Sequence, residues 1–132
     1  MFEHTLITGT LYTASKVRHA SKWIALKKEG WPIISTWIHE AGEGQTSDYK
    51  DLWTRCVREA CAASVTLVYV EEGDILKGGL VEVGAALAAG KPVFVLAGPE
   101  DLKALGSWVN HPKVHKYGSM SKVLEDLKVC LT

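Results

Sequence analysis

The sequence predicts an α/β fold in which a five-stranded parallel sheet carries helices on both faces. Short β-branched and apolar runs alternate with longer amphipathic segments along the chain. Residues 65–70 (VTLVYV) and 92–97 (PVFVLA) are almost entirely apolar, which is typical of central strands that are buried on both faces. Right-handed crossovers leave few topologies, and we expect the flavodoxin-like or Rossmann-like strand order 2-1-3-4-5.

In the first half of the chain, two strands flank a helix. Residues 5–12 predict the first strand, with Gly9 near its exit. Ser15 is a good residue for a helix N-cap, and Gly30 is a good residue for a helix stop, so we expect a helix between them. Residues 33–38 (IISTWI) are rich in β-branched and aromatic side chains, which predicts the second strand.

The second half continues the alternation, and no interdomain linker interrupts it. We therefore expect a single domain over residues 1–132, a length that is ordinary for one domain. We expect loops over residues 41–47 and 71–79, helices over 48–61, 80–89 and 119–130, and strands over 65–70, 92–97 and 114–117.

Composition narrows the classes of function. Fifteen basic and fifteen acidic residues give a formal net charge of zero, whereas proteins that bind the nucleic acid backbone usually carry a basic excess. The apolar runs are far shorter than the ~20 residues that span a bilayer, and the chain opens without a secretory signal. Three cysteines without CxxC spacing indicate reduced thiols. We expect a cytoplasmic protein with no nucleic acid or membrane partner, no cofactor and no metal.

The topology itself predicts where a ligand binds. In an open parallel sheet, ligands bind beyond the carboxyl ends of the strands, where the strand order reverses. Under the expected order, residues 9–15 and 71–79 line this crevice. Gly78 and Gly79 let the backbone approach a ligand closely, and Glu82 follows in the first turn of the next helix.

Glu82 is the main candidate for chemistry, because it stands in an otherwise apolar helix (LVEVGAALAAG). We expect Val81, Ala85 and Ala88 to form the inward face of that helix. A carboxylate among such residues is costly to bury without a purpose, and the helix N-terminus favours an anion there. We expect Glu82 to be ionised at neutral pH, either as a nucleophile or as a first-turn glutamate that only answers the helix dipole.

The stretch GGLVEVGAALAAGKPVFV resembles the signature of the nucleoside 2-deoxyribosyltransferase-like superfamily, which includes the deoxynucleoside 5′-monophosphate N-glycosidases. The matching positions are Gly78, Glu82, Gly84, Ala86 and Gly90-Lys91-Pro92. This resemblance implies that Glu82 attacks the anomeric carbon of a 2-deoxyribonucleoside and forms a covalent deoxyribosyl-enzyme. Water or a second base then releases the sugar.

The resemblance also suggests roles for other residues. Leu76 and Ser64 stand where many members carry aspartates, so Asp74 is the nearest candidate for the acid that protonates the leaving base, or else a plain turn residue. Tyr12 is a candidate to hold the sugar or the glutamate, with a half-buried strand-end aromatic as the alternative. Asn110 is a candidate to complete the site of a neighbouring subunit.

The remaining candidates are substrate-binding residues at the two loops. Lys77, near a glycine-rich helix start, is a candidate to meet a 5′-phosphate, and Ser15 is a second candidate unless it only caps a helix. Gly9, Gly78 and Gly79 complete the set of residues that we expect around the substrate.

Taken together, the residues and the resemblance predict an enzyme that cleaves or transfers the N-glycosidic bond of a nucleoside or nucleotide. The resemblance further implies a homodimer or higher homo-oligomer with a small-molecule substrate. Two alternatives stay open: a nucleotide-binding or nucleotide-sensing domain without catalysis, since a fold does not fix a function, and an NAD-type glycohydrolase. Glu82 pointing into an open crevice would favour an enzyme, and Glu82 tied to the backbone would favour a binding domain.

Overall fold

The computed structural model describes residues 7–41 and 47–132. Within these ranges, four parallel strands form one sheet in the order β1-β2-β3-β4. The strands are β1 (Leu11–Ala14), β2 (Val65–Tyr69), β3 (Val93–Leu96) and β4 (Val114–Tyr117). The α-helices are α1 (Ala20–Lys28), α2 (Tyr49–Ala62), α3 (Gly78–Ala88), α4 (Pro99–Leu105) and α5 (Met120–Leu131). Three short 3-10 helices are η1 (Val17–His19), η2 (Thr36–His39) and η3 (Ser107–Asn110).

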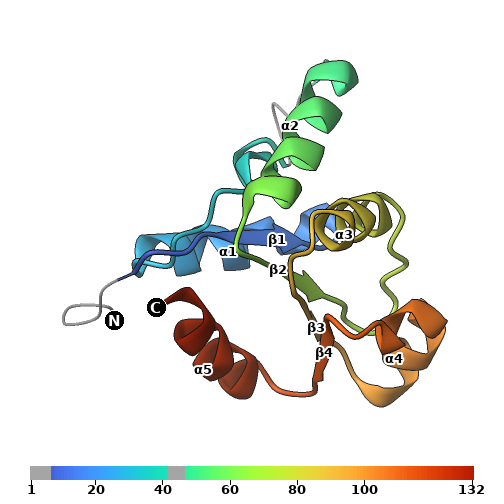
Figure 1. The fold of residues 1–132 in the computed structure, drawn as a ribbon. Helices are drawn as coiled ribbons and strands as arrows, with labels where there is room; N and C mark the ends of the chain where they lie inside the picture. The colour runs from blue at the N-terminus through green and yellow to red at the C-terminus, as the bar shows by residue number, and fades with distance from the viewer. Residues whose placement is uncertain (1–6, 42–46) are drawn as a thin grey trace.

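The helices cover both faces of the sheet (Figure 1). In that view α3 lies above the strands and α5 below them, while α2 packs against α3 and extends away from the sheet. Strands β1 and β3 are buried along their whole length, and so is β2 except at its last residue. This confirms 65–70 and 92–97 as central strands. No helix in the two described ranges is both long and apolar enough to cross a membrane.

The predicted five-stranded sheet is wrong, because residues 33–38 form a single bridge instead of a strand. Ile33 pairs with Leu11 in one parallel bridge. At the next ladder position Ser35 offers its side chain, and the Thr13 N–H donates to Ser35 Oγ at 2.6 Å. Hydroxyl side chains that bond to nearby backbone compete with regular pairing in this way, so the ladder ends after one step.

A carboxylate from α2 then turns the chain away from the sheet. The N–H and the hydroxyl of Thr36 donate to the two oxygens of Glu59 at 3.0 and 2.8 Å. Thr36 is the first residue of η2. The β propensity of this segment is therefore overridden by contacts with a helix that follows it in sequence.

The first strand begins later than predicted. β1 starts at Leu11, so Tyr12 lies inside the strand and not at its exit. Gly9 precedes the strand, and its N–H donates to the Leu131 carbonyl at 3.1 Å, at the edge of the sheet opposite to the carboxyl ends. Residues 1–6, and positions 42–46 of the predicted 41–47 loop, lie outside the described residues.

Candidate active site

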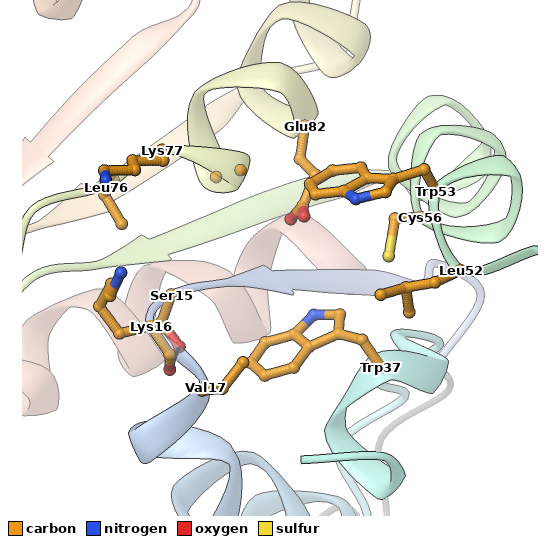
Figure 2. Close-up of a pocket in the computed structure, with 12 residues that line it drawn as sticks. Ser15, Lys16, Val17, Trp37, Leu52, Trp53, Cys56, Leu76, Lys77 and Glu82 are labelled. Carbon is orange, nitrogen blue, oxygen red and sulfur yellow. Dashed lines mark hydrogen bonds between the residues drawn. The ribbon is translucent and has the colours of Figure 1, made fainter. Parts of the chain in front are cut away.

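A cavity of about 220 Å³ opens at the carboxyl ends of β1 and β2, between the start of α3 and the side of α2. This is the place that the parallel topology predicts for a ligand. Figure 2 shows Lys16 and Lys77 at one end of the cavity and Leu52 and Cys56 at the other, with Glu82 between them. Trp53 lies beside the Glu82 carboxylate and Trp37 lies across the space from it. The lining residues are Ser15, Lys16, Val17, Trp37, Leu52, Trp53, Cys56, Leu76, Lys77, Gly78, Gly79 and Glu82.

Glu82 points into the cavity from the first half of α3 (Figure 2). Its side chain is only 7% exposed, and Val83 and Ala86 are buried beside it. The predicted inward face is wrong in part, because Val81 is 52% exposed and Ala88 is also exposed. No hydrogen bond joins the carboxylate to the other described residues that line the cavity. It is therefore free to meet a ligand.

Burial makes Glu82 a weaker acid than an ordinary glutamate. Loss of water around the carboxylate raises its pKa to about 7, and the charge of Glu59 acts in the same direction. The hydroxyl of Tyr12 partly offsets this rise. The expectation of full ionisation at neutral pH is therefore wrong. Glu82 lies beyond the first turn of α3, where it was predicted to lie, so the helix N-terminus does little to offset the desolvation.

Tyr12 stands behind Glu82 and not on the cavity surface. Its ring is fully buried in β1, and burial, then the charge of Glu82, raise its pKa far above the usual range. Its hydroxyl makes no hydrogen bond of normal geometry with a described residue, yet it is close enough to Glu82 and Cys56 to change their pKa values. Tyr12 is thus a neutral hydroxyl available to orient the carboxylate.

Asp74 is not brought to Glu82. Its carboxylate, 2% exposed, accepts Nε and Nη2 of Arg18 at 2.9 and 2.8 Å, and lies 2.8 Å from Nε2 of His19. It also accepts the Glu71 N–H at 2.9 Å. Burial alone would raise the pKa of Asp74, but these hydrogen bonds lower it below the usual value. An acid that holds its charge so firmly is a poor proton donor, so the predicted acid role does not fit this geometry.

The other predicted residues divide into two groups. Ser15, Lys77, Gly78 and Gly79 all line the cavity. Ser15 caps no helix; its hydroxyl donates to the Lys16 carbonyl at 3.0 Å and accepts the Trp23 indole N–H at 2.9 Å.

Gly9 and Asn110 lie elsewhere. Asn110 borders a separate hollow beside α4, where it accepts a hydrogen bond from Lys116 at 3.0 Å. Gly9 lies at the amino edge of the sheet, as described above. The sequence argument placed Gly9 in the crevice only because it ended β1 too early.

Sequence reasoning did not place Lys16, Val17, Trp37, Leu52, Trp53 or Cys56 among the site residues. Leu52 and Trp53 share one face of α2 with Cys56 because they precede it by four and three residues, and that spacing was visible. Their role was hidden because an apolar helical face usually packs into a core. Lys16 follows β1 directly and shares the cationic end of the cavity with Lys77 (Figure 2).

Comparisons with known proteins bear on the fold. No model of a protein family and no curated protein sequence matches the chain. The solution structure of BlsM is similar, with a TM-score of 0.70, 16% identity, and coverage of 92% of this chain and 88% of that chain. The CMP N-glycosidase BcmB of Clostridium botulinum has a TM-score of 0.57 at 14% identity, covering 91% and 98%. A molybdenum cofactor binding protein from the phototrophic bacterium Rippkaea orientalis has a TM-score of 0.56 at 16% identity, covering 96% and 100%. At such identities the chain shares a fold with these proteins, and its function has to be argued from the cavity itself.

Proposed function

We propose that this protein cleaves or transfers the N-glycosidic bond of a nucleoside or nucleoside 5′-monophosphate, with Glu82 as the nucleophile. The proposal is carried by one observation: a buried carboxylate points into an open cavity and is not tied to its walls. Such a group is costly to maintain, and strongly shifted acids gather at functional sites. The similarity in fold to the CMP N-glycosidase BcmB supports the same class of reaction.

The chemistry follows from the ionised form of Glu82. A carboxylate oxygen attacks C1′ of the sugar while the bond from C1′ to the base nitrogen breaks, and the bonding electron pair leaves with the base. The base takes its proton from water, since Glu82 is the one carboxyl group among the described residues that line the cavity. Water then attacks C1′ of the ester, releases the sugar and restores the carboxylate. A second base in place of water gives transfer.

Two lysines support a phosphorylated substrate. Lys16 and Lys77 line the end of the cavity away from the tryptophans (Figure 2), and neither makes an ion pair with a described residue. Lysine is a common phosphate ligand. We expect the 5′-monophosphate to be used in preference to the nucleoside, and Lys77→Ala to raise KM for the monophosphate alone. Lys91→Ala, just beyond the C-terminal end of α3, is the matched control.

The decisive experiment measures base release from ribo- and deoxyribonucleosides and their 5′-monophosphates, with and without an acceptor base. We expect release by the wild type and a loss of roughly a thousandfold or more in Glu82→Gln. Glu72→Gln, a neutralised carboxylate on an exposed loop residue, controls for the loss of charge. Equal release by Glu82→Gln, or no release from any compound, would reject the proposal.

A second candidate function is nucleotide binding without cleavage. The observation that favours it is that Asp74 is bound to Arg18 and His19. Asp74 is therefore not placed to donate a proton to the departing base. In that case calorimetry detects binding of compounds from the same panel, and no base is released from any of them. A dinucleotide such as NAD fits less well, because it joins two nucleotides and the cavity holds only about 220 Å³.

We also propose that the chain acts in the cytoplasm as a homodimer or higher homo-oligomer. Tyr49, Trp53 and Val57 form an exposed apolar stripe along α2, and Leu80 and Val81 of α3 are exposed as well. Exposed apolar stripes of this kind are typical of association surfaces. Sedimentation velocity at several concentrations tests this, and a monomer at all of them would contradict it.

A further inference from the structure

Two tryptophans line the cavity on either side of Glu82, away from the lysines. Trp37 comes from η2 and Trp53 from α2, and both line the cavity with Glu82. Figure 2 shows their indole rings on two sides of the space, with Leu52 and Cys56 at the far end and the Glu82 carboxylate beside Trp53. The space between them is unfilled by protein, so the tryptophans are not simply packed on each other.

Trp37 is a fixed wall. Its side chain is buried, and its indole N–H donates to the Thr13 carbonyl at 2.8 Å. Since that N–H is already used, Trp37 offers a ligand the surface of its ring and not a polar group. The single bridge at Ile33 and the turn into η2 bring the residue to this place.

Trp53 is placed by a glycine. A Cβ atom at Gly78 would lie 2.5 Å from Cη2 and 2.9 Å from Cζ2 of Trp53, so the ring occupies the room that a side chain at position 78 would take. Trp53 remains 36% exposed and is not a core residue. Gly78 therefore has a task in addition to starting α3, which is to let the indole lie over the cavity.

We propose that Trp37 and Trp53 form the subsite for the leaving base. This inference rests on the proposed function and adds the orientation of the substrate and the way its base is recognised. The planar heteroaromatic ring of the base lies at the tryptophan end, the sugar carbon at Glu82, and the phosphate at Lys16 and Lys77. The lysines lie at one end of the cavity, and the carboxylate and the indole rings lie together further in, which fits a phosphate at the first place and a sugar with its base at the second.

The recognition is by stacking. Stacking of a base on an aromatic side chain accepts any base, because every base has a π face. The described side chains at this end offer a base only the indole N–H of Trp53 and the thiol of Cys56, which is a weak hydrogen-bonding group and lies close to the Tyr12 hydroxyl. We therefore expect purine and pyrimidine monophosphates to differ little in affinity, within about tenfold.

The test measures binding to Glu82→Gln, in which the substrate stays intact, by calorimetry and tryptophan fluorescence. CMP, dCMP, dGMP and ribose 5-phosphate are the probes, and the last of these lacks a base. Adding Trp53→Leu should weaken nucleotide binding roughly 5- to 150-fold and leave ribose 5-phosphate unchanged. Trp53→Phe should restore most of the affinity, and Trp108→Leu is the matched control.

Gly78→Ala provides a second approach that keeps both indoles. We expect this substitution to displace the Trp53 ring and to weaken the binding of nucleotides more than the binding of ribose 5-phosphate. Gly84→Ala on the same helix, where a Cβ meets nothing within 4 Å, should have no effect. If Trp53→Leu does not fold, as judged by circular dichroism, the comparison of Gly78→Ala with Gly84→Ala decides.

The outcomes separate this inference from the proposed function. Unchanged nucleotide affinity in Trp53→Leu or Gly78→Ala, or equal losses for ribose 5-phosphate, would overturn the base subsite even if the wild type releases base. If the wild type releases no base but nucleotide binding still depends on Trp53, the glycosidase proposal is rejected and the base subsite is retained. No nucleotide binding at all would overturn both.

Discussion

At the scale of single residues, Glu82 combines burial with a task that requires charge. Its pKa of about 7 leaves roughly half of the molecules protonated at neutral pH, whereas the nucleophile has to be ionised. The oxocarbenium-like character of the transition state then favours the carboxylate form. Ionisation of one group is therefore expected to shape the pH dependence of the reaction.

The first prediction concerns the rate. The value of kcat/KM should rise about tenfold per pH unit below 7 and level off above it, because the free enzyme loses one proton from Glu82. Steady-state rates between pH 5 and 9 in buffers of constant ionic strength measure this. A flat profile across that range would contradict an ionising Glu82 nucleophile.

Tyr12→Phe gives the second prediction. The hydroxyl lowers the pKa of Glu82, so its removal should move the rate profile to higher pH. The same hydroxyl makes no hydrogen bond of normal geometry with a described residue, so its loss should change the free energy of unfolding by no more than about 1 kcal/mol. Urea denaturation and the pH profile test the two parts, and an unshifted profile would remove Tyr12 from the site.

At the scale of elements, Asp74 links the loop before α3 to the start of α1. It joins Arg18 and His19 on one side to the Glu71 backbone on the other. That loop continues directly into Lys77 and Gly78 of the cavity wall. Asp74 therefore acts as a tether that sets the position of the wall, in place of the acid role that its sequence position suggested.

The third prediction is that Asp74→Asn lowers the free energy of unfolding by about 2 kcal/mol. Breaking a buried ion pair usually costs more, but Arg18 is half exposed and recovers water. Chemical denaturation at pH 7 measures the loss, with Glu72→Gln on the same loop as control. Rates should fall mainly through KM, and a large fall in kcat alone would restore an acid role for Asp74.

Sequence reasoning located Glu82 at the cavity but did not determine how it lies. The helix is apolar or small on every side, so periodicity does not choose a face, and Val81, which was expected to face inward, is exposed. The loss of the strand at 33–38 depended on Ser35 meeting Thr13 and on Glu59 meeting Thr36. Those are contacts between segments distant in sequence, which local propensity does not contain.

At the scale of the whole molecule, the central strands were predictable because apolar runs buried on both faces have one common explanation. The burial of Glu82 also affects the stability of the whole molecule. The folded protein holds a proton on Glu82 up to a pKa of about 7, whereas an ordinary glutamate has a value of 4.5. The folded state thus binds more protons than the unfolded state between these values, and the free energy of unfolding falls as pH rises through them.

The fourth prediction follows from this decrease in the free energy of unfolding with rising pH. Relative to pH 4, Glu82 should lower the free energy of unfolding at pH 8 by on the order of 3 kcal/mol. Glu82→Gln should remove this dependence, so it stabilises the protein at pH 8 and has little effect at pH 4. Urea denaturation at both pH values, with Glu72→Gln as control, measures the difference, and an equal effect at both would contradict it.

The single bridge between Ile33 and Leu11 has a consequence for how this fold can diversify. Only one bridge pair joins the segment that carries Trp37 to the described part of the sheet, and its other contacts there are made by the side chains of Ser35 and Trp37. The ladder of β1 with β2 extends over four pairs and does not involve this segment. Insertions or exchanges beyond the bridge alter a wall of the cavity without changing the register of the sheet. The segment therefore behaves as an interchangeable cassette, and grafting it between proteins of this fold is a route to altered ligand preference on an unchanged framework.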